Sequence, residues 1–128
     1  MSIISDYILQ VKASIEKRPS VLSSKLIVDN RGDVVLYLKG EIVFTNQSEL
    51  HFKEYLVSIP QLEKIAYSYH YQDAEKNMIF RHDNAEHHPE LENFPHHKHV
   101  DQQTVSSEEV SLDDILDSIV NDMLDSKM

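Results

Sequence analysis

Seven of the eight histidines lie between Tyr67 and His99, and the same stretch contains Arg81. Imidazole is the side chain whose unperturbed pKa lies closest to neutral pH, so it can give or take a proton there. Histidines close to a guanidinium and to aromatic rings predict a site, although they leave its chemistry open. The rings are those of Tyr67, Tyr69, Tyr71 and Phe80.

One chemistry that these residue types fit is metal-independent RNA cleavage. A general base deprotonates the 2′-hydroxyl, a general acid protonates the leaving oxygen, and a cation stabilises the charge on phosphorus. His70 is the candidate for one proton transfer and His97 for the other, with Arg81 as the phosphate contact. His96 and His99 are alternatives to His97. The tyrosine rings can stack an unpaired base.

The same residues also have plainer interpretations. His70 fits a polar position on a solvated sheet face, and Arg81 can pair with Asp83 or Glu54 at the surface. Tyr67, Tyr69 and Tyr71 alternate strictly, which is typical of core or cross-strand packing as well as of a base platform. Both interpretations stay open at this point.

Glu54 occupies an unusual position. It continues the alternation of Leu50 and Phe52, so its carboxylate is expected to point inward. An inward carboxylate near histidines is either a candidate base or the partner of Arg81. We therefore include Glu54 among the candidate catalytic residues.

A metal site is a second chemical alternative. Zinc sites commonly use cysteines or two histidines at i and i+4 on a helix, and neither pattern occurs here. The segment Pro95–His99 can still bind transition metals, as histidine-rich tracts do. A metal-dependent hydrolase remains an alternative, while our expectation is no metal and no cofactor. Further potential ligands are His87, His88, Asp83, Glu86 and Glu90.

Charge is distributed unevenly along the 128 residues. The net charge is −10, and residues 101–128 hold eight acidic side chains against Lys127 alone, which gives −7. Residues 1–100 therefore carry only −3, so phosphate binding by this part is neither favoured nor excluded.

The chain has no cysteine, which excludes disulfides and thiolate metal sites.

The N-terminal sequence lacks the basic and apolar regions of a signal peptide, and no apolar run approaches the roughly 20 residues that span a bilayer. We expect a soluble, cytoplasmic protein that does not associate with membranes.

Apolar periodicity predicts a helix from Ser2 to about Lys17, followed by strands. Period-two segments begin near Leu26 and are separated by turn-prone polar stretches, and Gly40 is expected to allow a bulge or bend. The chain becomes irregular from Asn84. The predicted fold is α+β: an N-terminal helix, an antiparallel sheet of five or six strands, and a C-terminal amphipathic helix.

Residues 64–72 and 77–83 are expected to form a hairpin around a four-residue loop. Position 71 would pair with 78, 69 with 80 and 67 with 82, which makes His70 and Arg81 diagonal neighbours on one face. A one-residue slip would separate them. The opposite face would carry Tyr67, Tyr69, Tyr71, Met78, Phe80 and His82.

Residues 1–100 are expected to form one domain, followed by a polar linker at 101–110 and an acidic helix at 111–126. Ser111 and Asp114 resemble a capping box at the start of that helix. Its apolar stripe can dock on the sheet, or it can pair with a partner or a second copy of the chain. The linker and the −7 charge favour an interaction role. The stripe consists of Leu112, Ile115, Leu116, Ile119, Val120 and Met123.

Between Lys25 and Val100 the sequence resembles the TumE family of small bacterial and archaeal proteins. The most specific segments are Tyr69-His70-Tyr71, Phe80-Arg81 with Asp83-Asn84, and the run from Phe94 to His99. The sequence departs from the family pattern at His82, where an aromatic ring is expected, and at Glu86, where a small residue or proline is expected.

The resemblance implies a growth-inhibiting toxin of a type II toxin–antitoxin pair, neutralised by a helix-turn-helix antitoxin. It also implies an RNase-type action. The matching segments mark candidate site residues, but the resemblance assigns no catalytic role to any of them. A non-catalytic module that binds protein through its sheet face or C-terminal helix is the alternative from another class. Besides the catalytic candidates, the expected substrate contacts are Tyr69, Tyr71, Asp83, Asn84, His96 and His99.

Overall fold

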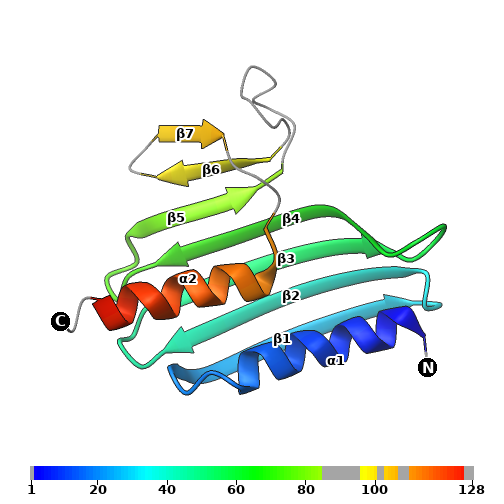
Figure 1. The fold of residues 1–128 in the computed structure, drawn as a ribbon, viewed down its shortest axis with the longest axis horizontal. Helices are drawn as coiled ribbons and strands as arrows, with labels where there is room; N and C mark the ends of the chain where they lie inside the picture. Colours follow the sequence, from blue (N-terminus) through cyan, green and yellow to red (C-terminus); the bar gives the residue numbers. More distant parts are fainter. Residues whose placement is uncertain (1, 85–95, 101–102, 107–109, 126–128) are drawn as a thin grey trace.

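A computed structural model describes residues 2–84, 96–100, 103–106 and 110–125 of the chain. The strands form one antiparallel sheet in which they neighbour one another in sequence order. One helix precedes the strands along the chain and another follows them (Figure 1), which confirms the predicted α+β architecture. The elements are α1 Ile3–Glu16, β1 Val21–Arg31, β2 Val35–Phe44, β3 Glu49–Val57, β4 Glu63–Gln72, β5 Met78–Asp83, β6 His97–Val100, β7 Gln103–Ser106 and α2 Leu112–Asp125.

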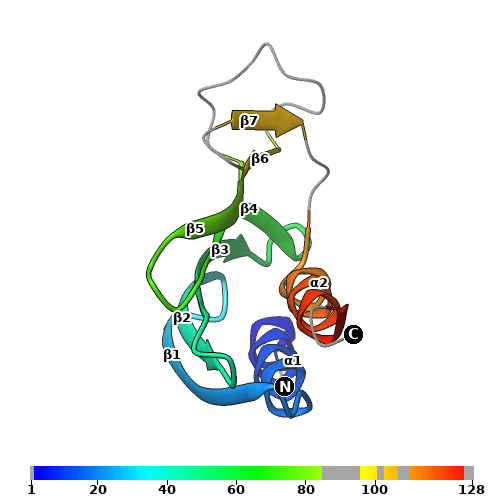
Figure 2. The same ribbon diagram turned by 90° about the vertical axis from the view of Figure 1, so that its left-hand side faces the viewer.

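Both helices pack on the same side of the curved sheet (Figure 2). The central strands β2, β3 and β4 alternate buried and more exposed side chains, because successive residues of a strand point to opposite faces. The buried residues of these strands pack against α1 and α2. We call the opposite side, which no helix of the described chain covers, the open face. It carries Tyr37, Lys39, Glu41, His51, Lys53, Tyr55, Ser68 and His70.

The apolar stripe of α2 lies in the core. Leu116 and Ile119 are fully buried, and three other stripe residues are nearly so. The predicted capping box is confirmed: Ser111 N donates to Asp114 Oδ2 at 3.2 Å, and Asp114 N donates to Ser111 Oγ at 3.1 Å. Of the two alternatives for this stripe, docking on the sheet is the one that the structure shows, because its residues belong to the core.

Of the bulge or bend expected at Gly40, no β-bulge is present. The β1–β2 and β2–β3 registers run without a shift through Gly40, which lies opposite Phe52. A Cβ atom at position 40 would lie 2.2 Å from Cε1 and 2.3 Å from Cζ of Phe52. Glycine is therefore required because the Phe52 ring packs directly over the backbone of β2.

The β4–β5 hairpin has a register two residues away from the predicted one. Tyr71 pairs with Phe80 and His70 pairs with Arg81, and an irregularity follows between Tyr71 and Gln72. Because the shift is even, each of these side chains keeps its predicted face. His70 and Arg81 are consequently direct cross-strand neighbours rather than diagonal ones.

The strands β6 and β7 were not expected from the sequence. β6 pairs with β5, and β7 pairs with β6 in the segment expected to be part of a polar linker. Each has only four residues, and polar side chains give neither strand an alternating apolar pattern. The described chain thus has seven strands in its sheet.

Neither α1 nor α2 is long and apolar enough to cross a membrane.

Candidate functional site

A row of ionisable side chains crosses the open face from β2 to β6. Glu41 lies opposite His51, His51 opposite His70, His70 opposite Arg81, and Arg81 opposite His99. Residues directly opposite on antiparallel strands have Cβ atoms about 5 Å apart, so each side chain reaches its neighbours. We call these five residues the His70–Arg81 row.

Arg81 is held in place by two other residues. Its Nε donates to Asp83 Oδ2 at 2.9 Å, and its Nη2 lies 3.0 Å from Nε2 of His99. The same nitrogen of His99 lies 3.2 Å from Asp83 Oδ2. Because the Asp83 side chain is only 7 % exposed, this carboxylate positions both the guanidinium and the imidazole. The predicted pairing of Arg81 is thus with Asp83, not with Glu54.

His70 lies at the centre of the row. Burial lowers the pKa of its imidazole below the usual value, and the nearby charges of Arg81 and His51 lower it further. Since the charged form is disfavoured, His70 is neutral at neutral pH and can accept a proton. His51, on its other side, lies 3.0 Å from Glu49 Oε1 and 3.6 Å from Glu41 Oε1.

Two lysines extend the cationic character of the open face. Lys39 and Lys53 are cross-strand partners, and Lys53 also lies opposite Ser68. Both lysines line a shallow pocket of about 240 Å³, together with His51, Ser68, His70 and Arg81. Lys39, His51 and Lys53 were not predicted as site residues, although each shares the polar alternation of its strand. Their proximity to His70 depends on strand pairing, which composition does not reveal.

Glu54 lies on the opposite side of the sheet from this pocket. The prediction that it points inward is confirmed, since the residue is 2 % exposed. The hydroxyls of Tyr7 and Tyr69 donate to its two carboxylate oxygens, and Lys64 Nζ lies 3.8 Å from Oε2. Burial and the Glu54 charge raise the pKa of both phenols, so they remain donors. Its candidacy as a catalytic base is therefore corrected to a structural role in the core.

The expected base platform is also part of the core. Tyr69 is fully buried and Tyr71 is 4 % exposed, so neither ring can stack a base. The Tyr71 hydroxyl donates to Ser48 Oγ at 2.7 Å. The packing interpretation of these tyrosines is therefore the correct one.

Asn84 and His96, which were expected to contact substrate, instead contact residues at the edge of the fold. Asn84 Nδ2 donates to the carbonyl of Ile65 at 2.9 Å, and Asn84 Oδ1 accepts from Tyr67 N at 3.0 Å, which extends the β4–β5 pairing. The His96 ring stacks on Tyr67, and its Nδ1 lies 2.9 Å from the phenol oxygen. Asn84 and His96 are thus engaged with the body of the fold rather than with the His70–Arg81 row.

His82 lies opposite Tyr69, on the other face of the sheet from the His70–Arg81 row. Burial lowers the pKa of His82 to about 4, with a further contribution from Lys98, so its ring is neutral at neutral pH. The His97 backbone pairs with Asp83, whereas its side chain lies outside the described residues. His87, His88, Glu86 and Glu90 lie outside them as well. The described part of the chain holds no group of three or more potential metal ligands.

Comparison with known proteins supplies the family. The family model described as Toxin TumE matches residues 11–126. The match includes α2, which lies beyond the segment where the resemblance was seen in the sequence. No curated protein and no solved structure matches the chain. Because the family model covers nearly the whole chain, the protein belongs to the TumE family of toxins.

Proposed function

We propose that this chain is the growth-inhibiting toxin of a type II toxin–antitoxin pair, and that it cleaves RNA at the His70–Arg81 row without a metal. One observation carries the proposal: Arg81 lies between two imidazoles, those of His70 and His99, on a sheet face that no helix of the described chain covers.

The chemistry assigns one role to each of these three residues. Neutral His70 takes the proton of the ribose 2′-hydroxyl, and the resulting oxygen attacks the adjacent phosphorus. Arg81 stabilises the negative charge that develops on the phosphate oxygens. The bond from phosphorus to the 5′ oxygen breaks, and His99 gives that oxygen its proton. The products are a 2′,3′-cyclic phosphate and a free 5′-hydroxyl.

The spacing of the strands supports His99 as the general acid. His70 and His99 lie on β4 and β6, which are separated by two strand spacings or roughly 10 Å. A phosphate bound at Arg81 fits between them, with the attacking and leaving oxygens on opposite sides. His51 is the direct neighbour of His70 and leaves less room, so we assign it a supporting electrostatic role.

We assign Asp83, which was expected to contact substrate, the role of a positioning residue. It holds Arg81 and His99 through one carboxylate oxygen, and fixed orientation of reacting groups contributes strongly to catalysis. The earlier assignment of His97 as the second proton-transfer residue is therefore replaced by His99, whose described contacts place it beside Arg81.

Membership of a toxin family implies an antitoxin partner. We propose that the antitoxin is a helix-turn-helix protein and that it neutralises the toxin by covering the open face, where the proposed catalytic residues lie. Cellular RNA as the target places the action in the cytoplasm. A non-catalytic module that binds through α2 is disfavoured because the α2 stripe is buried in the core.

The test is cleavage of a labelled single-stranded RNA by the purified chain in the presence of a metal chelator. The proposal predicts fragments that end in 2′,3′-cyclic phosphate and begin with a 5′-hydroxyl. Fragments with 5′-phosphates, or cleavage that requires an added metal, would contradict the mechanism. No cleavage at all would contradict the RNase assignment.

A further inference from the structure

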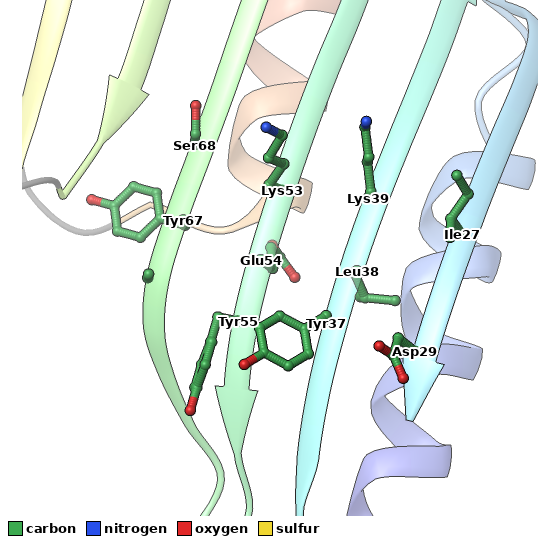
Figure 3. Close-up of a pocket in the computed structure, with 11 residues that line it drawn as sticks. Ile27, Asp29, Tyr37, Leu38, Lys39, Lys53, Glu54, Tyr55, Tyr67 and Ser68 are labelled. Carbon is green, nitrogen blue, oxygen red and sulfur yellow. The ribbon is translucent and has the colours of Figure 1, made fainter. Parts of the chain in front are cut away.

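A second hollow lies on the open face (Figure 3). It measures about 400 Å³ and shares Lys39, Lys53 and Ser68 with the smaller pocket that contains His70 and Arg81. The two hollows therefore adjoin each other at these three residues. We call the larger one the tyrosine groove, lined on the open face by Ile27, Tyr37, Lys39, Lys53, Tyr55 and Ser68.

Two aromatic rings form one end of the tyrosine groove. Tyr37 and Tyr55 are cross-strand partners whose ring centroids lie 4.7 Å apart in an edge-to-face arrangement. The Arg31 guanidinium lies 5.1 Å from the centroid of Tyr37. Tyr37 remains 39 % exposed, whereas the tyrosines at 67, 69 and 71 are buried. The chain thus presents an edge-to-face aromatic pair, with a partly exposed Tyr37 ring, beside a cationic site.

Lys39 and Lys53 form the boundary between the groove and the catalytic row. Like charges directly opposite on neighbouring strands are destabilising, and within the described residues neither lysine has an ion-pair partner. An anion bound between them would offset that repulsion. Asp29 also lines the groove, but its carboxylate accepts a hydrogen bond of 3.0 Å from Arg31.

These features favour single-stranded nucleic acid over other anionic ligands. Bases stack on aromatic side chains when they are unpaired, and lysines track the phosphates beside them. Along β3, Tyr55 and His51 are four residues or roughly 13 Å apart, with Lys53 between them. The Tyr55 ring, the Lys53 ammonium group and the His51 imidazole therefore lie in this order along β3. An extended strand of nucleic acid can follow the same line.

We propose that the tyrosine groove holds an unpaired base of single-stranded RNA against Tyr37 and Tyr55, while Lys39 and Lys53 bind the phosphate that connects it to the cleavage site. The part that concerns the cleavage site rests on the proposed function, whereas binding in the groove does not require catalysis. Tyr37 and Tyr55 are thus substrate-binding residues rather than catalytic ones.

The test is equilibrium binding of a short, fluorescently labelled 2′-O-methyl RNA, which lacks the nucleophile and cannot be cleaved by this mechanism. The full chain is compared with the double variant Tyr37→Leu/Tyr55→Leu and with Lys39→Ala/Lys53→Ala. The matched controls are Leu9→Ala and Lys12→Ala, which alter exposed side chains of α1. Circular dichroism and thermal melting establish that each variant is folded.

We expect roughly tenfold or greater weakening in the tyrosine variant, because each base–aromatic stack contributes substantially to affinity. The lysine variant is expected to bind more weakly and with a smaller dependence on salt concentration. Both controls should bind as the parent does.

Equal binding by the parent and a folded tyrosine variant would overturn the proposal, as would tighter binding of double-stranded than of single-stranded RNA. Failure of the parent to bind would also overturn it and would favour a protein occupant of the groove. Since the probe cannot be cleaved, these outcomes are independent of whether the purified chain cleaves RNA.

Discussion

Replacement of His70 by alanine is expected to lower the rate of RNA cleavage by about 10²- to 10⁴-fold, the usual contribution of a general base. His70 is neutral at neutral pH because burial and the charges of Arg81 and His51 lower its pKa. Alanine at this position removes the only imidazole that we assign to the first proton transfer. Single-turnover cleavage of a labelled RNA measures the effect.

The comparison variants separate catalysis from folding. Arg81→Ala is expected to lower the rate by roughly 10²- to 10³-fold, because it removes the cation that stabilises the developing charge. His99→Ala should lower it more than His51→Ala. Ile79→Ala, which removes an exposed side chain of β5, is the control and should leave the rate unchanged.

The pH dependence supplies a second measurement of the same assignment. Because the reaction needs neutral His70 and its pKa lies below the usual value, the parent's rate should fall on the acid side only below about pH 6.5. That acid limb should vanish in the residual activity of His70→Ala. Parent-like rates in a folded His70→Ala variant would exclude this residue as the base.

Replacement of Gly40 by alanine is expected to destabilise the fold by about 1–3 kcal/mol or more. The added Cβ would lie 2.2 Å from the Phe52 ring, and Phe52 is 1 % exposed, so the surrounding core prevents the ring from moving away. Denaturant unfolding of Gly40→Ala and of the parent measures the difference.

A double-mutant cycle identifies the physical cause. Phe52→Leu removes the ring atoms that the new Cβ would meet, so Gly40→Ala should cost less in the Phe52→Leu background than in the parent. If Gly40→Ala were as stable as the parent, the close approach of the ring to β2 would be wrong. Equal costs in both backgrounds would point to a cause other than this contact.

Local patterns in the sequence predicted the features that depend on neighbouring residues. Ser111 and Asp114 form the predicted capping box because both partners lie within one helical turn. The alternation in β4 correctly assigned His70 to one face and Tyr69 to the other. That assignment survived an incorrect register, because a shift by two residues preserves the face of each side chain up to the irregularity that pairs Gln72 with Met78.

Features that depend on distant parts of the chain could not be predicted in the same way. One of the two hydroxyls that donate to Glu54 comes from Tyr7 in α1, so the inward direction of Glu54 was predictable and its structural role was not. Gly40 was misinterpreted because the ring that requires it lies on the next strand. His51, Lys39 and Lys53 join His70 only through strand pairing, so the extent of the candidate site became visible only in the fold.

The most direct test of the central claim is RNA integrity in a bacterial host after induction of the parent chain or of His70→Ala at equal expression. The proposed function predicts growth arrest and fragmented RNA with the parent, and intact RNA with normal growth for the variant. Growth arrest with intact RNA, or identical RNA fragmentation by the parent and the folded variant, would contradict it.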